Sequence, residues 1–129
     1  MKSIFSKIIN KEIPCHLISE NNNSIAFLDI NPIAIGHVLV VPKLEVDYLF
    51  DLDSKIYSDL WDFSKAVACA LKKTIPCKKI GVSVIGLEVP HAHIHLVPIN
   101  HIHDINFQNK INLSSSDLES LAKKITSNI

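Results

Sequence analysis

The stretch Pro90–Pro98, which runs Pro-His-Ala-His-Ile-His-Leu-Val-Pro, alternates histidine with apolar residues. Because successive side chains of a β-strand point to opposite faces of a sheet, the pattern predicts that His91, His93 and His95 share one face. The apolar residues between them would point the other way, into a core. We therefore expect a strand over 89–99 with titratable rings on one face and apolar side chains that pack into the core on the other.

The rest of the chain predicts the elements that surround this strand. Periodicity and turn residues indicate a short helix over 4–10 capped by Ser3, strands over 16–19, 24–30, 37–41 and 80–85, a long helix over 53–73, and a last helix opened by a capping box at Ser116–Glu119. The connections between consecutive strands are too short for the crossovers that parallel strands need. The element order therefore predicts an antiparallel α+β fold, with residues 1–129 forming one domain.

Composition and charge exclude several classes of function. With 129 residues, 47% of them hydrophobic, the chain is typical of a globular protein that buries its own core. Thirteen basic and thirteen acidic residues cancel, which argues against a nucleic-acid partner, because binding to phosphate backbones needs clustered positive charge. The first residues lack the apolar segment of a signal peptide, and no apolar run approaches the ~18 residues of a membrane span.

The cysteines indicate a reducing compartment. Cys15, Cys69 and Cys77 are odd in number and lack Cys-x-x-Cys spacing, so we expect free thiols in a cytoplasmic protein rather than a disulfide framework. We expect Cys69 to be a small core residue on the apolar face of the long helix.

The histidine row has three possible interpretations. Incidental, solvated histidines are disfavoured because such an alternation is improbable by chance. A metal would need two of the rings together with His37 or a carboxylate from elsewhere, because a strand separates the α-carbons of His91 and His95 by ~13 Å whereas zinc–nitrogen bonds are ~2.0–2.1 Å. The third reading is covalent catalysis at phosphorus, in which a neutral imidazole attacks and its neighbours fix its tautomer and stabilise charge. We favour the third.

The same residues resemble the histidine triad (HIT) family of nucleotide hydrolases and transferases. The family's mark, His-φ-His-φ-His-φ-φ with φ apolar, stands here at His91–Val97. The segments 4–14, 26–32 and 36–43 look like the family's amino-terminal segment and nucleotide-binding strands. The branch resembled is the small nucleotide-binding one, typified by purine nucleoside phosphoramidases. The resemblance implies a HIT-like fold, with a five-stranded antiparallel sheet, one long helix and short terminal helices.

The resemblance also implies roles for individual residues. His93 matches the nucleophile that attacks the α-phosphorus and forms a nucleotidyl-histidine. His95 matches the residue that contacts the phosphate oxygens and the bridging atom, His91 the partner that orients the nucleophile, and His37 a fourth histidine behind it. Asp29 matches the carboxylate that holds the ribose hydroxyls. The matched apolar slot for the purine consists of Ile4, Phe5, Ile8, Phe27, Ile30 and Leu39, and backbone N–H groups near Val89 would contact the phosphate.

Two departures from the family pattern affect these expectations. The loop 84–90 is shorter than in the branch and lacks its Asn, Gln and Ser, while Glu88 would repel a phosphate unless it points away. Many bacterial relatives hold structural zinc through Cys-x-x-Cys near the amino terminus and a His after Pro-Lys. Those positions are Ser3, Ser6 and Glu45 here, so we expect no metal and no cofactor.

The function that these expectations favour is hydrolysis of purine nucleoside 5′-phosphoramidates or related nucleotidyl conjugates, with an AMP-like nucleotide as ligand. Two alternatives stay open: hydrolysis of dinucleoside polyphosphates by the same mechanism, and a regulatory nucleotide-binding module with little activity. The resemblance further implies a homodimer joined through the long helix and an edge strand.

Overall fold

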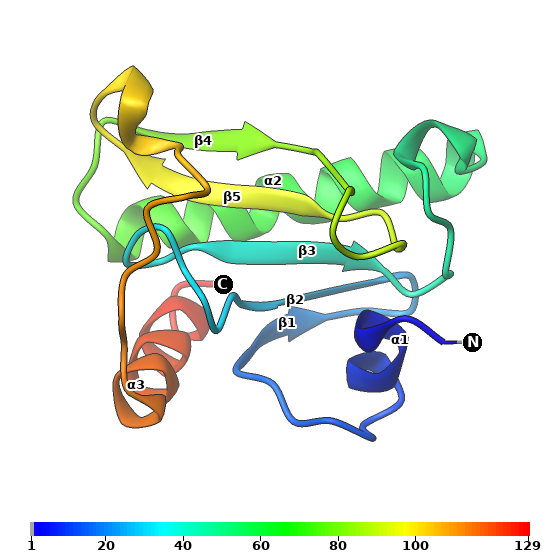
Figure 1. Cartoon of the computed structure of the whole chain (residues 1–129), viewed down its shortest axis with the longest axis horizontal. Helices are drawn as coiled ribbons and strands as arrows, with labels where there is room; N and C mark the ends of the chain where they lie inside the picture. Colours follow the sequence, from blue (N-terminus) through cyan, green and yellow to red (C-terminus); the bar gives the residue numbers. More distant parts are fainter. Residues whose placement is uncertain (1) are drawn as a thin grey trace.

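The sequence folds into one five-stranded sheet with helices packed against it (Figure 1). The computed structural model describes residues 2–129. The helices are α1 (Ile4–Ile9), α2 (Ser54–Thr74) and α3 (Ser115–Thr126), with short 3-10 helices at Leu49–Asp51 and Ile102–Asp104. The strands are β1 (Leu17–Glu20), β2 (Ser24–Leu28), β3 (Val38–Pro42), β4 (Lys79–Ser83) and β5 (Ile94–Ile99).

All neighbouring strands are antiparallel, in the order β1-β2-β3-β5-β4. The β1–β2 hairpin turns at Asn21, whose Oδ1 accepts the main-chain N–H groups of Asn23 and Ser24 at 3.0 and 2.9 Å. β3 lies in the middle and pairs with both β2 and β5. The predicted α+β class, with a five-stranded antiparallel sheet and one long helix, is confirmed.

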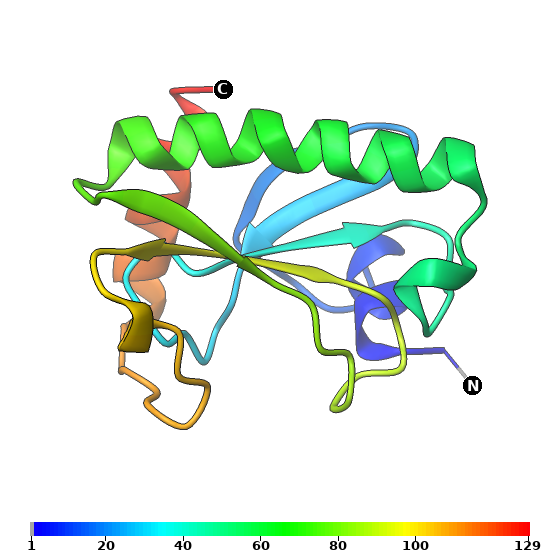
Figure 2. The same ribbon diagram turned by 90° about the horizontal axis from the view of Figure 1, so that it is seen from above.

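The two faces of the sheet have different partners. Figure 2 shows α2 running along one face, with α1 and the loop before β5 on the other. Along β3, Val38 and Val40 pack toward α2, whereas Leu39 and Val41 join Phe5 of α1. This double burial explains why the strand is apolar at successive positions rather than at alternate ones.

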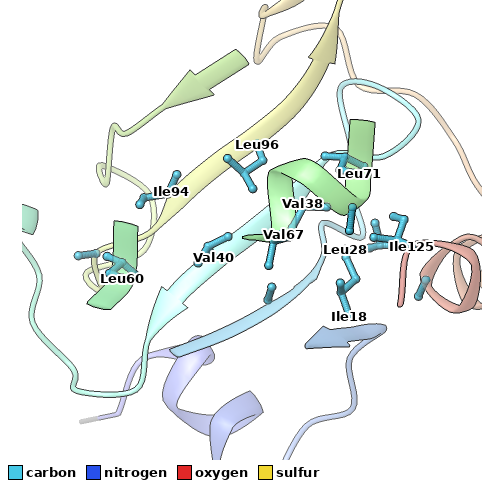
Figure 3. Packing of buried hydrophobic residues seen from close by; sticks show 14 of the residues in the cluster. Ile18, Leu28, Val38, Val40, Leu60, Val67, Leu71, Ile94, Leu96 and Ile125 are labelled. Carbon is cyan, nitrogen blue, oxygen red and sulfur yellow. The ribbon is translucent and has the colours of Figure 1, made fainter. Parts of the chain in front are cut away.

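The main core lies between α2 and the sheet (Figure 3). Leu60, Val67 and Leu71 recur on one side of the helix and are at most 1% exposed. Asp53 caps the helix by accepting the N–H of Ile56 at 2.9 Å, as predicted. Within residues 2–129, no helix is both long and apolar enough to cross a membrane.

The prediction that Cys69 belongs to this core is wrong, because its side chain is exposed. Two residues after Val67, it lies about 200° further round the helix, and so faces away from the sheet. All three cysteines of the described residues are free, as expected.

The predicted cap of the last helix is also wrong by two residues. Ser114, and not Ser116, accepts the N–H of Asp117 at 3.0 Å, and the Asp117 carboxylate accepts the N–H of Ser114 in return. The capping box therefore pairs Ser114 with Asp117 instead of Ser116 with Glu119, and the helix that it opens buries Leu118 and Ile125 in the core.

The histidine strand begins later than predicted, at Ile94 rather than at 89. Pro90 has no N–H to donate, and the N–H of His91 is used within a tight turn by the carbonyl of Val89, at 2.8 Å. The N–H of Ala92 leaves the sheet for the carbonyl of Val46, at 2.7 Å. Only His95 of the three histidines therefore lies in a paired strand.

Candidate active site

A cavity of about 580 Å³ opens on the α1 side of the sheet. Its lining includes ten of the residues singled out in the sequence: Ile4, Phe5, Ile8, Phe27, Asp29, Ile30, Leu39, Val89, His93 and His95. They come from α1, from β2 and the loop that follows it, from β3, and from β5 with the segment that leads into it. The other two predicted residues, His37 and His91, are fully buried behind this lining and hydrogen-bond to other groups.

The three histidine rings share one side although two of them precede the strand. Phe5 packs edge-on against His91 and His93, with ring centroids 5.9 and 4.9 Å apart, and the His93 and His95 rings are 4.8 Å apart. The intervening Ala92 and Ile94 enter the core under α2. The predicted division into a histidine face and an apolar face is therefore present, although of the three histidines only His95 lies in a paired strand.

The partner of His93 determines which of its nitrogens is free. Nδ1 lies 2.8 Å from the main-chain carbonyl oxygen of His91. A carbonyl only accepts, so Nδ1 carries the proton and Nε2 keeps an unshared electron pair. The ring lines the cavity, which makes Nε2 a ready nucleophile there.

The opposite arrangement holds for His95. The main-chain N–H of Ile33 donates to Nδ1 of His37 at 3.1 Å, so the proton of His37 is on Nε2. That Nε2–H donates to Nδ1 of His95 at 2.9 Å, which leaves the proton of His95 on its own Nε2. Neighbouring rings thus offer the cavity one electron pair and one proton.

The loop before β3 puts His37 in this position. Gly36 has φ +91°, a backbone conformation that residues with a Cβ rarely adopt. A Cβ at this position would also lie 3.1 Å from the side chains of Leu71, Ile75 and Pro98. The glycine therefore lets the chain turn tightly against the core before the buried histidine.

Burial keeps the rings of His37 and His95 neutral. Loss of hydration lowers the pKa of His37 to about 4 and that of His95 to about 3, and repulsion from nearby Lys110 and His93 acts in the same direction. Asp29 Oδ2 lies 3.6 Å from His37 Nε2, but the contact is not an ion pair at neutral pH because the ring is uncharged. The other carboxylate oxygen of Asp29 accepts the N–H of Asn31 at 2.8 Å.

Asp29, His37 and His95 are close enough to suggest a metal, with one ligand atom from each lying within 4.8 Å of the others. Their hydrogen bonds do not suit one. His37 Nε2 bears a proton, and moving that proton to Nδ1 would leave the N–H of Ile33 without an acceptor. The cluster is better described as a hydrogen-bonded pair of rings beside a carboxylate.

A family model described as the HIT domain matches residues 10–102 of the chain. The chain belongs to the HIT domain family. The family resemblance seen in the sequence is thereby confirmed, and members of this family are commonly nucleotide hydrolases.

Similar proteins cover the chain to different extents. An uncharacterized HIT-like protein of Borreliella burgdorferi is 35% identical over 98% of this chain and 97% of its own length. Adenosine 5′-monophosphoramidase HNT1 of Saccharomyces cerevisiae is 38% identical over 74% of this chain and 61% of the yeast protein. The crystal structure of a HIT-like protein involved in cell-cycle regulation from Bartonella henselae has a TM-score of 0.88 and 33% identity, and covers 99% of this chain. The HIT fold is therefore confirmed.

Phe107 and Lys110 are lining residues of this HIT domain's cavity to which the sequence analysis assigned no role. Phe107 and Lys110 line the cavity from the segment after β5, which the hydrogen bond from Ile111 N–H to the Pro32 carbonyl (2.8 Å) holds in place. The Phe107 ring packs 4.7 Å from that of His95, and Lys110 Nζ lies 5.9 Å from the Phe107 centroid. Both residues lie beyond the matched family segment, and no periodicity or motif in the sequence distinguishes them.

The loop before the histidine row also lines the cavity. Gly86, Leu87 and Glu88 are among the lining residues, and the Glu88 side chain is solvent-exposed. Cys15 is also a lining residue, and burial raises the pKa of its thiol, which keeps it protonated at neutral pH.

Proposed function

We propose that the chain is a nucleotide hydrolase that cleaves purine nucleoside 5′-phosphoramidates, or related nucleotidyl conjugates, through a nucleotidyl-histidine at His93. The observation that carries this proposal is the 2.8 Å hydrogen bond between His93 Nδ1 and the His91 carbonyl. It leaves Nε2 of a cavity-lining ring unprotonated, as attack on phosphorus requires.

The two neighbouring histidines divide the chemistry. Nε2 of His93 attacks the α-phosphorus, and the bond from phosphorus to the leaving nitrogen breaks. His95 keeps its proton and donates an Nε2–H hydrogen bond to the bridging atom and the phosphate oxygens, while the departing amine takes a proton from a solvent water. A second water then attacks the phosphorus and gives up a proton to the solvent, the bond to His93 breaks, and the nucleoside monophosphate leaves. His91 and His37 act from behind by fixing the tautomers of His93 and His95.

The remaining lining residues suit a purine nucleoside. Ile4, Phe5, Ile8, Phe27 and Leu39 present apolar and aromatic surface of the kind that holds a flat base. Asp29 accepts the Asn31 N–H through Oδ1, and the carboxylate has further lone pairs that can accept ribose hydroxyls. Ile30 and Val89 complete the rim, with Val89 beside the proposed phosphate position. We further propose that the whole chain, residues 1–129, works as one domain.

The direct test measures AMP release from an adenosine 5′-phosphoramidate with an amine leaving group. Wild-type protein should turn over, and His93→Ala should abolish release while AMP still binds. Wild-type activity that survives in His93→Ala would remove His93 as nucleophile. An inactive wild-type protein that binds AMP would favour a regulatory binding module.

One observation favours a second candidate, hydrolysis of dinucleoside polyphosphates. Lys110 lines the cavity and is close enough to lower the pKa of both His37 and His95 by repulsion, although burial is the larger cause. A cation there would attract phosphates beyond the α-position. Exposed Glu88 at the same cavity opposes this attraction and supports an amine as leaving group. Rates on the two substrate classes, measured side by side, decide between them.

We also propose a cytoplasmic homodimer in which α2 and the edge strand β4 contact a second copy. β4 is an edge of the sheet, and Val82 on it is 49% exposed, with apolar Val84 and Ile85 following. Edge strands with exposed apolar residues favour pairing. Light scattering of the full chain should give twice the mass of a monomer. In the Val82→Lys variant, the measured mass should fall to that of a single monomer.

A further inference from the structure

A hydrogen-bonded cluster lies on the side of His91 away from the cavity. Ser3 and Ser6 at the start of α1 meet Glu45, which follows β3: the Ser3 N–H and the Ser6 hydroxyl both donate to Glu45 Oε1, at 2.7 and 2.6 Å. Ser3 Oγ lies 2.7 Å from Nδ1 of His91. None of the three residues around His91 lines the cavity, so the cluster touches no nucleotide placed there.

The donors and acceptors of this cluster fit together in one way. His91 Nε2 lies 2.7 Å from the carbonyl of Pro42, which only accepts, so the ring proton is on Nε2 and Nδ1 is an acceptor. The Ser3 hydroxyl therefore donates to Nδ1, while its oxygen accepts the N–H of Ser6 at 3.0 Å as the cap of α1. A single hydroxyl thus caps the helix and orients the histidine ring.

Ser3, Ser6 and Glu45, the three positions that the family resemblance associates with structural zinc, do not suit that metal here. Structural zinc is held by thiolate, imidazole and carboxylate groups, whereas Ser3 and Ser6 offer hydroxyls. Glu45 Oε1 already accepts two hydrogen bonds, and Nδ1 of His91 accepts the proton of Ser3. The cluster is satisfied by its own donors and acceptors.

Charge in the cluster is fixed at neutral pH. Hydrogen bonds from the Ser6 hydroxyl and the Ser3 N–H lower the pKa of Glu45 to about 2, so it is a carboxylate. Burial lowers the pKa of His91, so its ring is neutral. The orientation of the ring is therefore set by hydrogen bonds and not by an ion pair.

We propose that Ser3 and Glu45 are positioning residues for the nucleophile. Glu45 holds the first turn of α1, Ser3 in that turn holds the ring of His91, and the carbonyl of His91 holds Nδ1–H of His93. Phe5 of the same helix packs 4.9 Å from the His93 ring, so one short helix supports the nucleophile from two sides. An isolated helix of six residues is unstable in water, so it depends on such anchors. This role rests on the proposed function of His93.

The test separates ring orientation from helix capping. Ser3→Gly keeps a residue that tolerates the cap position but removes the hydroxyl, and Ser3→Thr keeps the hydroxyl. We expect kcat for AMP release to fall about 10- to 100-fold in Ser3→Gly, with KM within about twofold, because a small misplacement of reacting groups costs that much. Ser3→Thr should retain most of kcat. Ser114→Gly, which removes the corresponding cap hydroxyl of α3, should leave kcat unchanged.

Glu45 gives a second comparison. Glu45→Ala removes the acceptor, whereas the amide oxygen of Glu45→Gln still accepts from Ser3 and Ser6. We expect kcat to fall in the alanine variant and to be largely restored in the glutamine variant. Equal kcat in wild type, Ser3→Gly and Glu45→Ala would overturn the proposal.

Nitrogen-15 NMR of the histidine rings tests the proposal independently of turnover. In wild type, His93 should carry its proton on Nδ1 and His91 on Nε2. Ser3→Gly removes the donor to His91 Nδ1 but leaves the carbonyls of Pro42 and His91 in place, so both tautomers should persist. The His91 Nδ1 resonance should instead move toward that of an acceptor without a hydrogen bond, and the His93 ring resonances should broaden. If wild type fails to release AMP but Ser3→Gly shows these changes, the proposed function fails and the positioning role stands. Unchanged His93 resonances in Ser3→Gly would overturn the positioning role whatever the activity.

Discussion

His37 and His95, 58 positions apart in the sequence, are joined by a 2.9 Å hydrogen bond between ring nitrogens. His37 lies just before β3 and His95 within β5, and these two strands are neighbours in the sheet. The bond fixes the proton of His95 on the nitrogen that faces the cavity, so a fully buried residue controls the hydrogen-bonding character of a cavity-lining one.

Removing this bond should slow the chemical step. In His37→Phe, a ring of similar size keeps the packing but donates nothing to His95, so we expect kcat for AMP release to fall about 10- to 100-fold. KM should change little because His37 does not line the cavity. His37→Gln, which can place an amide N–H near His95, should lose less. Steady-state kinetics checks this, and full activity in His37→Phe would contradict it.

Stability should fall on mild acidification. His37 and His95 have folded-state pKa values of about 4 and about 3, below the ordinary 6.5, so between these values the unfolded chain binds more protons than the folded one. Their contribution to stability is therefore complete above pH 6.5 and is lost progressively as pH falls toward 4 and 3.

Urea unfolding at pH 7.5, 6.0 and 5.0 measures this loss. The unfolding midpoint should decrease with pH in wild type and decrease less in His37→Phe. His101→Phe, at an exposed histidine, should show the wild-type dependence. A midpoint that does not vary between pH 7.5 and 5.0 would contradict burial of neutral rings.

Lys110 should affect substrates according to the charge of the leaving group. Lys110→Ala removes a cation from the cavity, so hydrolysis of a dinucleoside polyphosphate should lose about tenfold in kcat/KM, as expected for one lost charge-assisted contact. A phosphoramidate with a neutral amine leaving group should lose much less. Lys124→Ala, at an exposed lysine of α3, is the matched control. Equal losses on both substrates would show that Lys110 does not select between them.

Core packing under α2 should dominate stability. Leu71 is fully buried between the helix and the sheet, so Leu71→Ala should lower the free energy of unfolding by about 2–5 kcal/mol. Ile102→Ala, at a side chain that is 98% exposed, should change it by less than about 0.5 kcal/mol. Urea denaturation of the two variants beside wild type makes the comparison, and similar losses in both would be inconsistent with this core.

The sequence predicted those parts of the fold that depend on local pattern. Periodicity located α1, α2 and the strands, and the positions of Ser3 and Asp53 identified their helix caps. The errors occurred at Cys69, at the start of α3 and at the start of β5. The capping box expected at Ser116 lies at Ser114, and β5 begins at Ile94 because the N–H of Ala92 bonds to the Val46 carbonyl, which no local pattern reports.

The amino-acid sequence by itself determined the alternation of histidine and apolar residues, and with it the face on which the chemistry lies, because strand geometry follows from the backbone alone. Tertiary structure decided which nitrogen of each ring carries a proton, because that depends on partners such as Ser3, Ile33 and Pro42, which are distant in the sequence. It also brought Phe107 and Lys110 to the cavity, since only packing of the last segment against the sheet places them there.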